Sequence, residues 1–311
     1  MKNIKLGLIS MATFEAIKPP YNLSEPTVEE NLQLALEILD VAGKNQLDIA
    51  VLPETFAFSG INAQKLKNLA ENYPDKNLIQ VSNKAKEYNM NIVAGFYTIL
   101  DGKLRNISVY INREGKVTGL YIKKYTTDGE INVGVIPGTS SLENVFDTEF
   151  GKIGLAICFD INWDSIWKKF EEKNTDLIFW ISAYEGGLPL QSRALLHGIP
   201  IVTSVMSYHS KLIDISGEIL GSTSRWNRLK IIDFNLDRGI FHVDNQYDKI
   251  MYLQKKYGNQ IDITSFTQEH LFVLESKSKN FSIKDLALKE NLVNYKSYIS
   301  DCTQLVNESA Q

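Results

Sequence analysis

The stretch GKIGLAICFD, residues 151–160, combines a strand pattern with a reactive side chain. Its apolar residues 153–157 are typical of a strand that is buried on both faces, and a helical pattern begins soon after them. Cys158, one of two cysteines in the chain, lies at the junction. A thiol at such a turn can face a cleft, and amide groups at the start of a helix favour its thiolate form. Taken alone, a free cysteine is more often a small buried core residue.

Two upstream segments also place a charged residue just after a strand. The run DIAVLPETF, residues 48–56, indicates a short buried strand that ends near Pro53, and Glu54 follows it. The run GLYIKKY, residues 119–125, is a second strand pattern that ends in two lysines. Open α/β sheets bind ligands at the carboxyl ends of their strands, where a glutamate can act as a general base. Taken singly, Glu54 is equally compatible with a solvated loop, and a pair of lysines after a strand is more often solvated.

In combination, the charged residues and the cysteine resemble a known family. Glu54, Lys123 and Cys158 follow one another in the order of the Glu–Lys–Cys triad of the nitrilase, or carbon–nitrogen hydrolase, superfamily. Three runs resemble its motifs: LPE at 52–54, YIK at 121–123 and the decapeptide at 151–160. The resemblance covers about residues 4–225. It implies an α/β fold, a four-layer α-β-β-α sandwich of the nitrilase type.

The resemblance also assigns chemical roles. Cys158 would attack an amide carbonyl, and Glu54 would take the thiol proton, pass it to the leaving amine and then activate water. Lys123, selected over its neighbour by the Tyr-x-Lys frame, would stabilise the oxyanion. Glu130 is the candidate for the second glutamate that many members carry, and it would position substrate or hold the lysine.

The residues around the cysteine carry the expectations about substrate. Phe159, whose amide is a candidate oxyanion donor, and the aromatic residues Trp163 and Tyr184 are the candidate substrate-binding residues. Where relatives often have Arg-Phe-Pro-Glu, this chain has NWDS at 162–165. Without that guanidinium a substrate carboxylate is poorly compensated, and Asp164 leaves a neutral or cationic substrate open. The four histidines show no metal-ligand spacing, so we expect no metal and no cofactor.

Composition limits the remaining functional classes. The chain has 311 residues, with 33 basic and 37 acidic side chains and a formal charge of −4, which argues against a nucleic-acid partner. No apolar run reaches about 18 residues, so we expect no membrane association. The first ten residues resemble a strand rather than a signal peptide, which favours a cytoplasmic location.

The alternation of strand and helix patterns predicts a layered α/β fold. Strands are predicted at 4–9, 48–52, 92–99, 106–111, 117–122, 153–158, 177–181, 201–205, 211–215 and 230–234, and helices at 28–44, 75–89, 164–173, 189–198, 248–257 and 283–297. We expect a carbon–nitrogen hydrolase domain at 1–270. The C-terminal extension at 271–311 is expected to be helical and, by resemblance, to form an interface in a homodimer or higher homo-oligomer.

These observations predict an enzyme that hydrolyses an amide of a small molecule through a cysteine thioester. Phe159 and Asp160 after the cysteine resemble the amidase and carbamoylase branches, whereas nitrilases usually carry Trp-Glu there. Three alternatives stay open: an N-carbamoyl amidase or nitrilase, an acyltransferase that uses the same acyl-enzyme, and a catalytically silent binding protein. The last is less favoured because the triad is intact.

Overall fold

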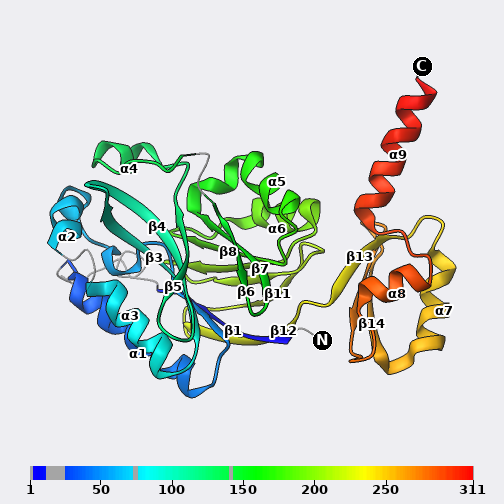
Figure 1. Cartoon of the computed structure of the whole chain (residues 1–311), viewed down its shortest axis with the longest axis horizontal. Helices are drawn as coiled ribbons and strands as arrows, with labels where there is room; N and C mark the ends of the chain where they lie inside the picture. Colours follow the sequence, from blue (N-terminus) through cyan, green and yellow to red (C-terminus); the bar gives the residue numbers. More distant parts are fainter. Residues whose placement is uncertain (1–2, 12–24, 73–75, 140–142, 311) are drawn as a thin grey trace. The chain divides into compact units, whose positions relative to one another are not determined.

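The computed structural model describes residues 3–11, 25–72, 76–139 and 143–310 (Figure 1). The chain forms two compact units, one from Ile4 to Asp233 and another that contains the residues from Phe234 onward. The domain boundary predicted from the sequence lies later, after residue 270. The earlier division has a physical reason, because strands on both sides of residue 270 hydrogen-bond within one small sheet.

The larger unit is built on two six-stranded sheets. The first has the order β12-β1-β2-β3-β4-β5, in which β1, β2 and β3 are parallel and β3, β4 and β5 are antiparallel neighbours. Its strands are β1 (Asn3–Ile9), β2 (Ile49–Val51), β3 (Asn91–Leu100), β4 (Lys103–Ile111), β5 (Val117–Ile122) and β12 (Leu229–Asn235).

The second sheet has the order β11-β10-β9-β8-β7-β6. Its strands are β6 (Val145–Thr148), β7 (Gly151–Ile157), β8 (Leu177–Ser182), β9 (Ile201–Val205), β10 (Lys211–Ile213) and β11 (Ile219–Ser222). The central strands β7, β8 and β9 are parallel, and every residue of β8 is buried, as its continuous apolar run predicts. The short edge strands β6 and β11 were not predicted, because they lack such a run.

Helices cover the outer faces of both sheets (Figure 1). Helices α1 (Val28–Lys44) and α3 (Lys76–Glu87) pack on the first sheet, and α5 (Asp164–Glu172) and α6 (Gly187–His197) pack on the second. The inner faces of the sheets contact each other through β3 and β8 and through β4 and β7. The predicted four-layer sandwich is therefore confirmed.

Helix starts follow local sequence. Thr27 accepts a hydrogen bond from the amide of Glu30, and the Glu30 carboxylate accepts one from the amide of Thr27, which fixes the start of α1 where it was predicted. Two short helices, α2 (Leu66–Asn72) and α4 (Asp128–Asn132), were not predicted. Short 3-10 helices lie at Phe56–Phe58, Ala63–Lys65, Cys158–Asn162 and Gly258–Gln260.

The smaller unit combines a three-stranded antiparallel sheet with three helices. The sheet has the order β13-β15-β14, formed by β13 (Arg238–His242), β14 (Ile261–Phe266) and β15 (Leu271–Ser276). The helices are α7 (Tyr247–Tyr257), α8 (Ile283–Lys289) and α9 (Tyr295–Ser309). Glu290, after α8, accepts hydrogen bonds from the hydroxyl of Tyr257 and from Lys256, which fastens α7 to the end of α8.

The prediction of one helix over 283–297 is wrong. The chain leaves helical geometry after α8, where Asn291 has a φ of +50°, and the side chain of Asn294 then caps the start of α9. Asparagine readily adopts the left-handed conformation seen at Asn291 and readily caps a helix start, as Asn294 does. These two residues explain why α8 and α9 are separate helices. None of the helices in the described ranges combines the length and the apolar character that a membrane span requires.

Candidate active site

The three motif residues lie just beyond the carboxyl ends of β2, β5 and β7. All are buried, with 4% of Glu54, 1% of Lys123 and 7% of Cys158 exposed. Charged side chains are rarely buried so deeply unless they are paired, since the loss of water is costly. The contacts that compensate this burial define the site.

Glu54 is held by both sheets. Its Oε2 accepts a 2.9 Å hydrogen bond from the amide of Ala183, just after β8, and its Oε1 faces Lys123. Gly95 in β3 makes room for this arrangement, because a Cβ there would lie 2.7 Å from the Cα of Glu54 and 2.7 Å from the side chain of Ile181 in β8. The backbone around Glu54 is thus fixed by a close approach that only glycine permits.

Lys123 bridges two carboxylates. Its Nζ donates to Glu54 Oε1 at 2.8 Å and to Glu130 Oε2 at 2.7 Å. Burial lowers the pKa of Lys123, but the facing carboxylates of Glu54 and Glu130 outweigh burial and keep the pKa above its ordinary value. Lys123 therefore carries its positive charge throughout the physiological pH range, as an oxyanion donor requires.

Glu130 reaches the lysine from the first turn of α4. Thr127 and Glu130 form a capping box, in which the Thr127 hydroxyl accepts from the amide of Glu130 and the amide of Thr127 donates to Glu130 Oε2. Burial raises the pKa of Glu130, but the charge of Lys123 and a hydrogen bond from Asn106 outweigh burial and lower the pKa. The structure therefore brings Glu130 into the cluster as a carboxylate that holds the lysine.

Cys158 opens a 3-10 turn in a strained conformation. Its φ is +45°, and the side chains of Glu54 and Ser182 lie near its thiol. A left-handed residue between a strand and a helical turn stores local strain, which is typical of functional positions. The resting site does not favour the thiolate form of Cys158 that was predicted from the sequence. Burial, followed by the adjacent carboxylate of Glu54, raises the pKa of the thiol well above its ordinary value, so Cys158 is protonated at rest.

Asp160 ties the cysteine turn to the lysine strand. It is fully buried and accepts hydrogen bonds from the Tyr121 hydroxyl at 2.9 Å, the amide of Tyr125 at 3.0 Å and the amide of Ile157 at 3.0 Å. Burial raises the pKa of Asp160 to about 6, although these donors favour the charged form. The second and third sequence motifs thus meet at one carboxyl group.

Aromatic residues surround the outer side of the cysteine. Phe159 packs edge-to-face on Trp163, which stacks on Tyr125 with ring centroids 3.9 Å apart. Burial raises the pKa of Tyr184 to about 12, and the nearby Cys158 and Glu54 add to the effect. Phe159 follows Cys158 directly, and the pKa of Tyr184 responds to Cys158 and Glu54, so both partly exposed rings lie near the cluster. Trp163 contacts Phe159 and Tyr125 and packs against the core under the second sheet.

One aromatic residue that responds to the cluster was not predicted from the sequence. Burial, followed by the charges of Glu130 and Glu54, raises the pKa of Tyr97 in β3. Gly95, two residues earlier, is the only sequence signal nearby, and it marks a close backbone approach without naming the tyrosine.

The expectation about Asp164 needs correction. Its carboxylate binds Arg193 at 2.5 Å and Lys168 at 2.9 Å, so its charge is already compensated by protein cations. Asp164 is therefore not a free anion for a cationic substrate. Arg193 is held by this ion pair, and its guanidinium lies over the ring of Trp167.

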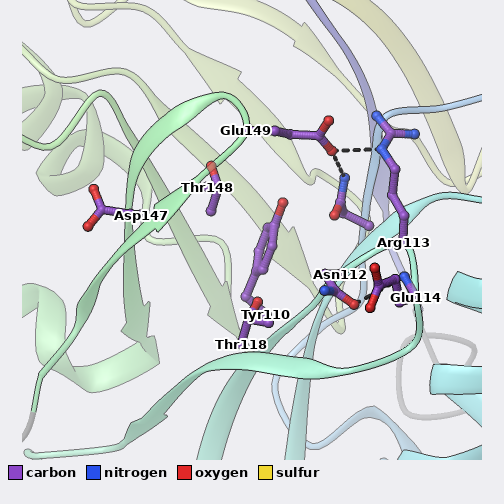
Figure 2. A pocket seen from close by; sticks show the side chains of 9 residues that line it. Tyr110, Asn112, Arg113, Glu114, Thr118, Asp147, Thr148 and Glu149 are labelled. Carbon is purple, nitrogen blue, oxygen red and sulfur yellow. Dashed lines mark hydrogen bonds and ion pairs between the residues drawn. The ribbon is translucent and has the colours of Figure 1, made fainter.

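A polar cavity of about 300 Å³ lies away from these residues, between the β4–β5 turn and β6 (Figure 2). Figure 2 shows Arg113 joined to Glu149, and Arg113 also binds Asp48 at 2.7 Å. Thr118, which lines the cavity, is five residues before Lys123, or roughly 17 Å along an extended strand. The ion pairs here join the two sheets at the end opposite to the cluster.

Comparisons with known proteins agree on one family. The family model described as carbon–nitrogen hydrolase matches residues 16–240. A deaminated glutathione amidase of Synechocystis sp. is 26% identical over 245 residues, which cover 69% of this chain and 89% of that protein. An omega-amidase of Xenopus tropicalis is 24% identical over 241 residues, which cover 69% of this chain and 86% of that protein.

Comparison with solved structures shows the same fold. Saccharomyces cerevisiae Nit3, described as a member of branch 10 of the nitrilase superfamily, superposes with a TM-score of 0.65 at 21% identity, covering 82% of this chain and 97% of that chain. An amidase from Nesterenkonia sp. gives a TM-score of 0.63 at 16% identity, covering 74% and 90%. One structure of that amidase is described as carrying acrylamide added at its active-site cysteine.

Proposed function

The chain belongs to the carbon–nitrogen hydrolase family, and we propose that it hydrolyses an amide of a small molecule through a thioester on Cys158. The observation that carries this proposal is the buried cluster of Glu54, Lys123 and Glu130 with the thiol of Cys158 beside Glu54. A protonated nucleophile in contact with a carboxylate is arranged for general-base activation.

The acylation step uses the resting protonation states. Glu54 takes the proton of the Cys158 thiol while the sulfur attacks the amide carbon, and the carbonyl oxygen gains the negative charge. Lys123 donates two of its three N–H groups to carboxylates, and the third is available to the oxyanion together with the amide of Phe159. Collapse breaks the carbon–nitrogen bond, and Glu54 returns the proton to the departing amine.

The second step releases the acyl group. Glu54, again a carboxylate, removes a proton from a water molecule that attacks the thioester carbon, and the carbon–sulfur bond breaks. The leaving sulfur regains its proton from Glu54, so the enzyme returns to its starting state with an acid released. Glu130 takes no proton in this scheme and keeps Lys123 in place.

The substrate is expected to be an uncharged amide. The side chains that act on the thiol are Glu54, Lys123 and Ser182, none of which is an arginine. Arg193, the nearest arginine in sequence after the NWDS segment, is engaged by Asp164. Two relatives are named for the amides on which they act, deaminated glutathione amidase and omega-amidase, and amides of both kinds belong in the same screen.

A substrate panel tests this function. The purified protein would be incubated with simple amides, deaminated glutathione, ω-amides, N-carbamoyl amino acids and nitriles, and ammonia release would be measured. Turnover of an amide that disappears in Cys158→Ala supports the proposal. Preferential transfer of the acyl group to added amines would instead support an acyltransferase, and turnover retained by Cys158→Ala would contradict the thioester route.

A further inference from the structure

The carboxamide of Asn106 in β4 contacts both glutamates of the cluster. Its Nδ2 donates to Glu54 Oε1 at 2.8 Å and to Glu130 Oε1 at 2.7 Å. The residue is completely buried, and its backbone carbonyl accepts a 2.9 Å hydrogen bond from the amide of Lys123. Asn106 therefore contacts three of the charged residues on which the proposed chemistry rests.

We propose that Asn106 is a positioning residue that holds Glu54 and Glu130 on opposite sides of Lys123, so that Glu54 faces the thiol as an ionised base. This inference rests on the catalytic roles proposed for Glu54 and Cys158.

The donor count supports the assignment. The amide nitrogen of asparagine has two hydrogens, and here each one points to a different carboxylate. Two buried carboxylates share only one ammonium, so a neutral donor to both lowers the cost of keeping both ionised. The hydrogen bond from Asn106 is one of the causes that lower the pKa of Glu130.

The other end of the same carboxamide supports the orientation. In the described part of the chain, Asn106 Oδ1 is buried and accepts no hydrogen bond. The reversed orientation would bring that oxygen against two carboxylates, which repel it. The two carboxylates therefore fix the orientation of the carboxamide, although this leaves Oδ1 without a hydrogen-bond donor. A buried acceptor left unpaired in this way indicates a functional role for the side chain rather than a packing role.

Asn106→Leu provides the test, because leucine has a similar volume and no donor. Asn91→Leu is the matched control: Asn91 is equally buried, and its Nδ2 also donates twice, to the carbonyl of Asp48 and to Glu149, at the other end of the sandwich. The rate of Cys158 alkylation by iodoacetamide and the amidase kcat/KM would be measured from pH 5 to 9, with Tm recorded for each variant.

Asn106→Leu should lower kcat at least tenfold with little change in KM. It should also move the acid limb of the alkylation and kcat/KM profiles to higher pH by about one unit, because a hydrogen bond to a charged group is worth about one pKa unit or more. Asn91→Leu should leave both profiles unmoved. Unmoved profiles in Asn106→Leu, or equal shifts in the two variants, would overturn the inference. If Asn106→Leu does not fold, Asn106→Ser takes its place with the same expected shift. Failure of the proposed function would appear separately, as turnover in Cys158→Ala.

Discussion

Replacement of Lys123 with methionine should affect both the rate and the stability. At an effective dielectric constant of about 20, contacts of 2.8 and 2.7 Å to two carboxylates are each worth roughly 6 kcal/mol before the loss of hydration is counted. Because desolvation offsets much of this, removal of one partner from a buried pair typically costs about 3–5 kcal/mol. The loss of an oxyanion donor should also raise the barrier by about 3–4 kcal/mol, a 10²- to 10³-fold decrease in kcat.

The stability loss should depend on pH in a defined direction. Without the ammonium, Glu54 and Glu130 are two buried carboxyl groups in contact with one amide, so one of them keeps a proton in the folded variant at neutral pH. The unfolded chain releases that proton above about pH 4.3. The folded variant then binds more protons than the unfolded one, so its stability falls as pH rises. The difference in Tm between wild type and variant should widen from pH 5 to 8.

Lys124→Met is the matched control. Lys124 is adjacent on the chain, but its Nζ lies over the ring of Tyr125 and is partly exposed, a contact worth about 0.5–1 kcal/mol. Thermal unfolding at several pH values and ammonia release would be measured for both variants. Equal losses in the two variants, or a Tm difference for Lys123→Met that does not change with pH, would refute the electrostatic reasoning.

Three further results are expected. Cys158→Ala should abolish turnover with little change in Tm, whereas Cys302→Ala should keep near wild-type activity; activity above a few per cent in the first variant would remove its thiol from the mechanism. Neutral amides should exceed carboxylate-bearing analogues about a hundredfold or more in kcat/KM, because an uncompensated buried charge costs about 3–5 kcal/mol; efficient hydrolysis of the latter would redirect the search to Arg193. Glu290, whose pKa is lowered to about 2 by its tyrosine and lysine donors, contributes stability that is present above about pH 4.5 and lost as pH falls through 2. The Tm difference between wild type and Glu290→Gln should therefore narrow from pH 6 to 3, and a constant difference would contradict this.

The sequence predicted those parts of the site that follow the ends of strands. Glu54, Lys123 and Cys158 are separated by 69 and 35 residues, yet each could be located by a local pattern, because an apolar strand run ends just before it. Helix α1 was predicted with its correct bounds from another local signal, the helical spacing of Leu32, Leu36, Leu39 and Ala42 on one face.

The contacts between distant segments could not be predicted in this way. Asn106 donates to carboxylates 52 and 24 residues away, and Asp164 pairs with an arginine 29 residues later. Neither contact leaves a periodic signal in the sequence. The protonated state of Cys158 was missed because it depends on burial by both sheets, whereas the helix-start argument considers only the turn that contains the residue.

The protonation states of the cluster follow from its charge balance. Glu54 and Glu130 contribute two negative charges, Lys123 contributes one positive charge, and an ionised Cys158 would raise the net charge of the buried group from −1 to −2. Burial penalises that second uncompensated charge, so the thiol keeps its proton until Glu54 takes it. The carboxylate that raises the pKa of the thiol is then the group that accepts its proton, and the negative charge moves from Glu54 to the sulfur and on to the oxyanion beside Lys123. Because two carboxylates share one ammonium, the thiol is neutral at rest, and Glu54 can then act as the general base that removes its proton.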